Sequence, residues 1–203
     1  EDDSVESYTG KIFESAMASL DQVHHSLDMS AVNRAVDLLT QAKKIAFFGL
    51  GSSAAVAHDA MNKFFRFNVP VIYSDDIVLQ RMSCMNCDDD DVVVIISHTG
   101  RTKSLVELAQ LARENDAMVI ALTSAGTPLA REATLAITLD VPEDTDIYMP
   151  MVSRLAQLTV IDVLATGFTL RRGAKFRDNL KRVKEALKES RFDKEPFVPS
   201  DNQ

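Results

Sequence analysis

Residues 91–112 read DVVVIISHTGRTKSLVELAQLA, a passage from one apolar pattern to another through a short polar loop. Five consecutive β-branched residues at 92–96 have the length and composition of a strand that is buried on both faces. Leucine and alanine then recur at a spacing of three and four, which is typical of an amphipathic helix. A hydroxyl-rich loop, residues 97–102, is therefore expected between a buried strand and the start of a helix.

The same alternation of strand and helix patterns continues on both sides of this stretch. Further apolar, β-rich runs occupy residues 45–49, 69–74, 117–124 and 133–139, and helical patterns occupy 53–67, 76–84, 103–115 and 128–132. Strict alternation of this kind requires right-handed crossovers between parallel strands. The sequence therefore predicts an α/β three-layer sandwich, in which a five-stranded parallel sheet carries helices on both faces.

Additional helices are expected at both ends of one domain that spans residues 1–203. A helical lead-in covers 8–42, with an amphipathic helix at 8–28 and a second helix from near Ser30, and the core covers 43–172. After a helix at about 152–172, a Lys- and Arg-rich helix covers 174–191, and a tail at 193–203 is expected to be disordered. We interpret the basic face of the 174–191 helix as a solvated surface rather than a nucleic-acid or partner patch.

The composition narrows the function classes. There are 22 basic and 30 acidic residues, a net charge of −8, so the chain by itself should bind DNA poorly. No run of about 18 apolar residues suggests a membrane span, and no signal peptide pattern opens the sequence, so a cytoplasmic location is expected. Cys84 and Cys87 could form a redox pair or half of a zinc site, but the acidic run at 88–91 would raise their pKa values. Reduced thiols without a metal are the better interpretation.

Polar residues gather where three of the expected strands end, the edge at which open parallel sheets bind ligands. Hydroxyls together with free N–H groups at the start of a helix suit a phosphate group, because the helix dipole adds to their hydrogen bonds. The candidate ligand-binding residues are Gly51, Ser52 and Ser53 after the first strand, Ser97, His98, Thr99, Gly100, Arg101 and Thr102 after the third, and Ser124 after the fourth.

Two other interpretations of these loops stay open. Serine and threonine are favoured helix N-caps, although capping explains single residues better than a cluster across three loops. The stretch GLGSSA at 49–54 fits a loosened dinucleotide-binding fingerprint, and Asp75 follows the second strand where a ribose-binding acid would lie, so NAD binding is an alternative. A Walker A loop is excluded, because no Gly-Lys-Ser/Thr follows the glycines.

Three motifs resemble the SIS (sugar isomerase) domain in order and spacing, over roughly residues 30–172. They are Gly51-Ser52-Ser53, SHTGRT at 97–102 and ALTSAGTPLAREA at 121–133. The stretches FFGLGSSAAVAHDA at 47–60 and SRLAQLTVIDVL at 153–164 resemble more closely the RpiR family of bacterial transcriptional regulators, in particular its repressors of glucose catabolism by the Entner–Doudoroff route. The resemblance implies a flavodoxin-like strand order, a dimer or tetramer, and a helix-turn-helix domain before the SIS domain that makes the contacts with DNA.

The resemblance also implies that the chain senses 2-keto-3-deoxy-6-phosphogluconate, without a cofactor, and that this ligand releases DNA. Thr99 stands where many members of the family have serine, which keeps the hydroxyl. SIS isomerases place a general-base glutamate near the helix after the fifth strand, but residues 147–161 contain no Asp or Glu. This absence favours a sensor over an enzyme, because Glu143, Asp144 and Asp146 lie earlier in a loop and could serve only if that loop folded inward. An aldose–ketose phosphosugar isomerase or an amino-sugar phosphate lyase is the enzymatic alternative.

Basic side chains in and near the loops have two possible uses. Arg101, Lys103 or Arg154 could pair with a carboxylate of the ligand, or could form ordinary surface salt bridges. A proton-transfer role for His98 is conceivable but is not favoured.

Overall fold

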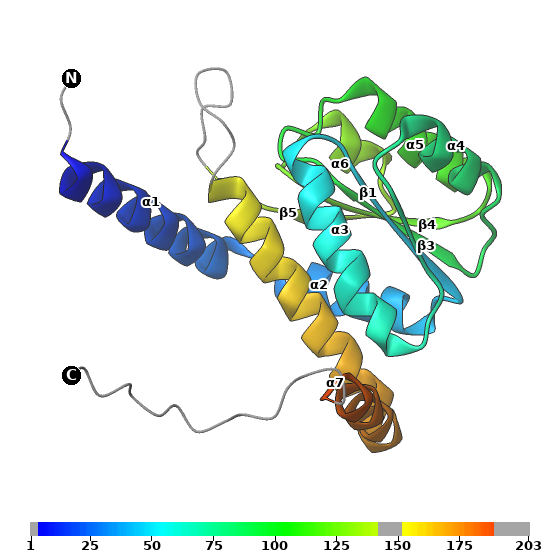
Figure 1. The fold of residues 1–203 in the computed structure, drawn as a ribbon. Helices are drawn as coiled ribbons and strands as arrows, with labels where there is room; N and C mark the ends of the chain where they lie inside the picture. The colour runs from blue at the N-terminus through cyan, green and yellow to red at the C-terminus, as the bar shows by residue number, and fades with distance from the viewer. Residues whose placement is uncertain (1–3, 142–151, 189–203) are drawn as a thin grey trace, which may run out of the picture.

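The computed structural model describes residues 4–141 and 152–188, in which five parallel strands form one sheet with helices on both faces (Figure 1). The strand order is β2-β1-β3-β4-β5, the flavodoxin-like order, and every neighbouring pair is parallel. The strands are β1 (Lys44–Gly49), β2 (Val71–Ser74), β3 (Asp91–Ile96), β4 (Met118–Thr123) and β5 (Leu135–Thr138). The predicted fold class is confirmed, and each strand lies within two residues of its predicted bounds.

Helices cover the two faces of the sheet in separate groups. Helices α2 (Met29–Gln41), α3 (Ser52–Phe64) and α7 (Val152–Lys188) pack on one face, and α4 (Ile77–Met85), α5 (Lys103–Glu114) and α6 (Pro128–Glu132) pack on the other. The 3-10 turn η1 (Phe65–Phe67) ends α3, and α1 (Val5–Ser26) leads into the domain. Among the described helices, none combines the length and the apolar character that crossing a membrane would require.

The apolar runs of the central strands fill two cores because successive side chains of a strand point to opposite faces. In β1, Ile45 and Phe47 join the core under α2, α3 and α7, whereas Ala46 and Phe48 join the core under α4, α5 and α6. All six residues of β3 are buried. Burying a side chain the size of Phe47 contributes about 1.5–3 kcal/mol, so neither face of these strands tolerates polar residues.

The long helix α7 is bent at Gly173, which has a φ of 78° and a ψ of −166°. A residue with a side chain rarely adopts a positive φ, so glycine permits the bend. The ring of Phe176, beyond the bend, lies 5.7 Å from that of Phe67 and 5.8 Å from that of Phe168. Gly173 is not helical and separates two helical segments, 152–172 and 174–188, which agrees with the division expected from the sequence. Residues 189–191 and the tail at 193–203 lie outside the described residues.

Helix α1 begins earlier than the sequence pattern predicted. The Oγ of Ser4 accepts a hydrogen bond from the Ser7 N–H at 3.2 Å, and this cap starts the helix at Val5 rather than near residue 8. Only Ser19 and Val23 of α1 are buried, and the first turns project from the body of the domain (Figure 1).

Candidate functional site

The loops that follow β1, β3 and β4 lie side by side at one edge of the sheet. The strand register places Gly49 beside Ile96 and Ile96 beside Leu122, so the chain leaves these three strands at the same level. The strand order reverses between β1 and β3, because α3 leads outward to β2 whereas α5 leads outward to β4. Open α/β sheets bind ligands at such a switch point, and the predicted site residues are therefore in the appropriate place.

The two helices that begin at this switch point have no side-chain cap. The N-cap residues Gly51 of α3 and Thr102 of α5 make no capping hydrogen bond. By contrast, Asp28, Asp76 and Thr127 cap α2, α4 and α6 through their side chains. The N–H groups of Ser53, Ala54 and Leu105 already donate to backbone carbonyls of the preceding turn. Within the described residues, the N–H groups of Ser52, Lys103 and Ser104 are thus the ones available, with the positive end of each helix dipole, to an anion at the edge of the sheet.

The loop at 97–102 is held in place by its own serine and by the neighbouring loop. The Gly100 N–H donates to the Oγ of Ser97 at 3.2 Å. The Ser124 N–H donates to the carbonyl of His98 at 3.1 Å, and the Leu129 N–H donates to the carbonyl of Gly100 at 3.1 Å. Ser97 accepts in the first of these bonds, so its own hydroxyl hydrogen remains available to a ligand.

Glycine is required at position 100 by both conformation and space. Its φ is 58°, and a Cβ added there would lie 2.4 Å from the Oγ1 of Thr123 and 2.3 Å from that of Thr127. These two hydroxyls lie 3.4 Å apart, and the Oγ1 of Thr127 also donates to the carbonyl of Ser124 at 3.1 Å. Thr127 was missed by sequence reasoning; its position before Pro128, at the start of a short helix, signals only a cap.

The candidate residues differ in how they are exposed. Ser53, Ser97 and Gly100 are buried, Ser52, His98 and Ser124 are half-buried, and Gly51, Thr99, Arg101 and Thr102 are exposed. The hydroxyl of Ser124 donates weakly to the carbonyl of Leu139 at 3.4 Å, which leaves it less available than the others. In the same loop, the Ala125 N–H donates to the Oδ1 of Asp140 at 3.0 Å. The structure brings all the candidates to one edge, and their contacts with a ligand stay a prediction.

Gln80, which sequence reasoning did not single out, supports the loop after β1. Its side chain is fully buried, and its Nε2 donates to the carbonyls of Gly49 at 3.3 Å and Ser74 at 2.7 Å. It therefore ties together the ends of β1 and β2. The Oε1 of Gln80 has no hydrogen-bond partner among the described residues. A polar residue on a nine-residue surface helix gave no sequence signal of this role.

The first turns of α7 bring neutral polar groups towards the same edge of the sheet. Helix α7 begins at the same end of the domain as α3 and runs alongside it (Figure 1), with Lys63 of α3 3.1 Å from Asp162 of α7 and the ring of Phe64 5.4 Å from that of Phe168. Ser153 and Gln157 are buried near the beginning of α7, and neither side chain ionises near neutral pH. The carboxylates at 143, 144 and 146 lie outside the described residues.

Cations at the site have no acidic partner within the described ranges. Arg101, Lys103 and Arg154 are exposed, and none of the three forms an ion pair with a residue of 4–141 or 152–188. The surface salt bridges that the sequence left as one option for these residues are thus not found in this part of the chain.

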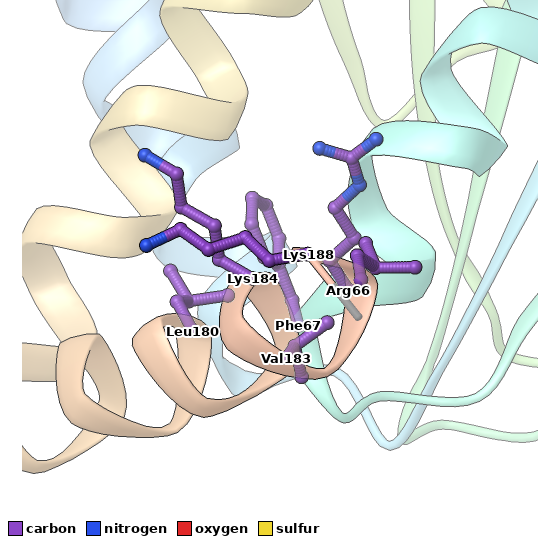
Figure 2. Close-up of a pocket in the computed structure, with 7 residues that line it drawn as sticks. Arg66, Phe67, Leu180, Val183, Lys184 and Lys188 are labelled. Carbon is purple, nitrogen blue, oxygen red and sulfur yellow. The ribbon is translucent and has the colours of Figure 1, made fainter. Parts of the chain in front are cut away.

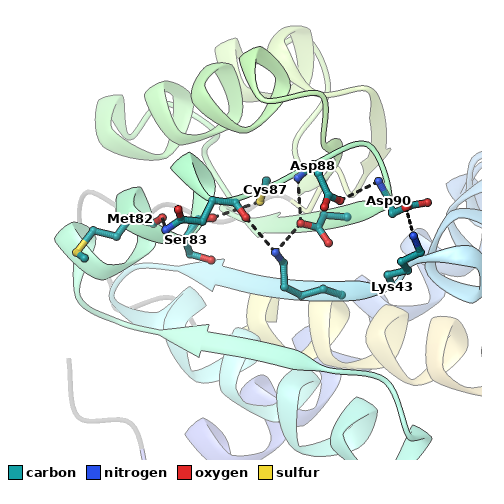
Figure 3. A network of polar contacts seen from close by, with 9 residues as sticks. Lys43, Met82, Ser83, Cys87, Asp88 and Asp90 are labelled. Carbon is teal, nitrogen blue, oxygen red and sulfur yellow. Dashed lines mark hydrogen bonds and ion pairs between the residues drawn. The ribbon is translucent and has the colours of Figure 1, made fainter.

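A separate polar network lies at the opposite edge, where the strands begin (Figure 3). The Nζ of Lys44 at the start of β1 lies 2.6 Å from the Oδ2 of the buried Asp91 at the start of β3, and Lys43 pairs with Asp90. The Asp88 N–H donates to the Oδ2 of Asp91 at 3.1 Å. These contacts join β1 to the turn before β3 and engage Asp88, Asp90 and Asp91 of the acidic run.

The two cysteines are unsuited to redox chemistry in this environment. Burial raises the pKa of the Cys84 thiol to about 12. Burial also raises the pKa of Cys87, and this effect outweighs the nearby positive charge of Lys44, which lowers that pKa. The Sγ of Cys87 donates to the carbonyl of Ser83 at 3.3 Å. A reactive thiol needs a lowered pKa, so the geometry agrees with the interpretation of both as reduced thiols.

Comparisons with known proteins agree with the geometry. The family model of the SIS domain matches residues 38–167. The chain is 92% identical over 203 residues to the HTH-type transcriptional regulator HexR of Escherichia coli K12, covering the whole chain and 70% of that protein. It is 57% identical over 192 residues to HexR of Pseudomonas aeruginosa, covering 95% of the chain and 67% of that protein.

A solved structure shows the same fold. The Vibrio vulnificus NanR protein, in complex with ManNAc-6P, superposes with a TM-score of 0.83 at 23% identity, over 92% of this chain and 70% of that one. From the strand order, the family model and the two regulators, it follows that the chain belongs to the SIS-domain proteins, among the HexR-type transcriptional regulators.

Proposed function

We propose that the chain is the sugar-phosphate-sensing part of a transcriptional regulator, and that its ligand is the phosphorylated sugar acid 2-keto-3-deoxy-6-phosphogluconate. The observation that carries the proposal is the pair of uncapped helix N-termini, α3 and α5, at the switch point of the sheet. The relatives named as HTH-type regulators support the regulatory part of the proposal.

The phosphate of the ligand would occupy the space between the starts of α3 and α5. Available there are the backbone N–H groups of Ser52, Lys103 and Ser104 and the hydroxyls of Ser52, Ser97, Thr99 and Thr102. A hydrogen bond to a charged oxygen contributes about 1.5–3 kcal/mol, so a few such bonds hold a phosphate dianion without a buried lysine. The bonds that fix the 97–102 loop keep these donors in position before the ligand arrives.

The carboxylate of the ligand would pair with a basic side chain beside the cradle. Arg101 and Lys103 are exposed next to the start of α5 and have no acidic partner in the described ranges. A guanidinium can bind a carboxylate through two parallel hydrogen bonds. This pairing distinguishes a sugar acid phosphate from a neutral hexose phosphate, which offers no second anionic group.

We expect binding without turnover. Moving a proton between adjacent sugar carbons requires an ionisable group with a suitable pKa close to both carbons. Ser153 and Gln157, the buried polar side chains at the start of α7, offer only neutral dipoles. The two relatives are named as regulators rather than enzymes.

Control of DNA binding would arise from differential affinity of the ligand for two arrangements of the regulator. The chain spans 70% of the E. coli relative, and we assign DNA contacts to a helix-turn-helix domain in the remainder of such a regulator. A ligand that draws the starts of α3 and α5 together would favour the arrangement that releases DNA.

Calorimetric titration of the chain with 2-keto-3-deoxy-6-phosphogluconate, glucose 6-phosphate, fructose 6-phosphate and NAD tests the proposal, with NMR of each mixture to detect conversion. The sugar acid is expected to bind saturably without turnover. Ser97→Ala and Thr102→Ala should each weaken it roughly 10- to 100-fold, the equivalent of one charge-assisted hydrogen bond. Thr159→Ala, which removes a hydroxyl from the exposed side of α7, is the matched control and should change nothing.

Each other outcome selects a different function. Conversion of any sugar phosphate would make the chain an isomerase or lyase, and saturable binding of NAD would make it a dinucleotide-binding domain. Unchanged affinity in both Ser97→Ala and Thr102→Ala would remove the cradle from the proposal. Arg101→Gln should weaken the sugar acid alone, and an equal loss for glucose 6-phosphate would show that Arg101 does not read the carboxylate.

A further inference from the structure

The apolar face of α1 is covered at only one end. Near the end of the helix, Val23 is buried in the core and Leu20 packs against it. Towards the start, the same face is exposed, with between 46% and 66% of each large apolar residue open to solvent. These residues are Val5, Tyr8, Ile12, Phe13 and Met17, and we call them the α1 stripe. A contiguous apolar stripe on a soluble protein commonly marks a surface that another chain covers.

A groove of matching character lies between η1 and the part of α7 beyond Gly173 (Figure 2). It has a volume of about 440 Å³ and is lined by Phe67, Leu180, Val183 and Leu187 on its apolar side. Three cations, Arg66, Lys184 and Lys188, stand around it. None of these cations forms an ion pair with any residue that the structure describes. We call this surface the η1–α7 groove.

The two surfaces carry opposite charge. Residues 171–188, which include the α7 side of the groove, contain eight basic and two acidic residues. Residues 1–26, which include α1, contain six acidic residues and one basic residue. Of the acidic residues, Glu6, Glu14 and Asp21 are exposed on α1 itself. An acidic amphipathic helix is therefore complementary to an apolar groove that is rimmed by cations.

A chain cannot place its α1 stripe in its own groove while both elements keep their anchors. The end of α1 is fixed at the ligand-binding edge of the sheet, where the Nε2 of Gln22 donates to the carbonyl of Asp140 at 2.9 Å. The η1 turn ends α3 and leads into β2, so the groove lies at the opposite edge. Figure 1 shows α1 projecting away from the end of α7 that forms the groove.

We propose that the α1 stripe of each chain occupies the η1–α7 groove of a second copy, so that two copies exchange their first helices. The contact is reciprocal, and a two-fold arrangement satisfies both stripes and both grooves at once. A helix of 22 residues is about 33 Å long, which lets it reach across to a neighbour while its last turn stays in its own core. Repeating the contact twice helps the interface to reach the roughly 1,000 Å² that specific association needs.

Sedimentation equilibrium of the full chain over a concentration series tests the proposal. Phe13→Glu places a charge in the stripe, and Leu187→Glu places one in the groove, so each is expected to weaken dimerisation at least about tenfold. Met82→Glu is the matched control, because Met82 is a 56% exposed apolar residue on α4, outside both surfaces. Circular dichroism of each variant checks that the fold is retained. Dimerisation lost in Phe13→Glu but kept in Leu187→Glu would overturn the groove as the binding partner.

Mixing and charge reversal separate the exchange from other arrangements. A mixture of Phe13→Glu and Leu187→Glu chains retains one intact stripe-and-groove contact and should associate more strongly than either variant alone. Glu14→Lys and Lys184→Glu should each weaken the dimer, and the double variant should recover part of the loss. No recovery in either experiment would contradict the exchange.

One further result would also overturn it. A chain that stays monomeric at every concentration tested would leave the stripe without a second copy.

Discussion

Replacing Gly100 with alanine should destabilise the domain by two separable effects. Its φ of 58° costs an alanine about 1–2 kcal/mol. The new Cβ would also lie 2.3 Å from the Oγ1 of Thr127 and 2.4 Å from that of Thr123, which forces a shift in a packed region at a cost of about 1–3 kcal/mol. Because these threonines also hold the loop after β4, they cannot move away without loss of hydrogen bonds. Gly100→Ala should therefore lower the free energy of unfolding by about 2–5 kcal/mol.

Gly126→Ala separates the two effects. Gly126 lies in the adjacent loop with a φ of 67°, but nothing stands within 4 Å of the position of its Cβ. Both variants carry the backbone cost and the same change in unfolded-state entropy, so their difference reports the packing cost alone. Urea unfolding followed by circular dichroism gives both values, with Gly100→Ala expected to be less stable by about 1–3 kcal/mol. Equal stability of the two variants would refute the close packing of Gly100 against the threonines.

Three other changes test the packing elsewhere. Gln80→Glu replaces a buried donor with a carboxylate that faces two carbonyl oxygens, so the free energy of unfolding at pH 7 should fall by about 3 kcal/mol or more. The loss should be smaller at pH 5, where the carboxylate is more readily protonated, and urea unfolding at both pH values measures it. Burial raises the pKa of Cys84 to about 12 in the folded protein, above the value of about 8.5 in the unfolded chain. The contribution of this thiol to the free energy of unfolding is therefore complete below about pH 8.5 and is lost as the pH rises towards about 12. Between pH 9 and 10 the wild type should lose up to about 1.4 kcal/mol more than Cys84→Ala in urea unfolding, and parallel losses would contradict this. Gly167→Ala, on α7, brings a Cβ to 2.6 Å from the Cγ2 of Val36 on α2, so thermal and urea unfolding should show a loss of about 1–3 kcal/mol in the free energy of unfolding. Adding Val36→Ala should largely remove this loss. If the effects of the two substitutions were simply additive, α2 and α7 would have moved apart instead.

The strands, and the gathering of the candidate residues at one edge of the sheet, could be predicted because their signals are local. Runs such as residues 92–96 have no polar position and are rich in β-branched residues, which is typical of a strand buried on both faces, and the structure buries them as expected. Strict alternation with helices then fixed parallel pairing, and the hydroxyls at the strand ends followed from that topology. The uncapped start of α3 also has a local origin, since Gly51 has no side chain to form a cap. The uncapped start of α5 does not, because Thr102 has a hydroxyl that could cap the helix but makes no capping hydrogen bond.

The rest depends on contacts between segments that are distant in sequence. The periodicity of α1 shows an apolar face but not that the domain covers only its last turns. From the sequence, Gln80 is expected at the surface, but the packing of α4 places its side chain in hydrogen-bond contact with the ends of β1 and β2. Likewise, the 174–191 pattern predicted a basic surface helix, but the groove it forms with η1 depends on the direction of the bend at Gly173.

Asp140 connects a loop of the candidate site to the end of helix α1. Its side chain accepts a hydrogen bond from the loop that carries Ser124, and its carbonyl accepts one from Gln22 at the root of α1. A ligand that displaces this loop must either break the bond between Ala125 and Asp140 or carry Asp140 along with it. In the second case the displacement is delivered to the base of a projecting helix about 33 Å long, where a small rotation becomes a large movement at the far end.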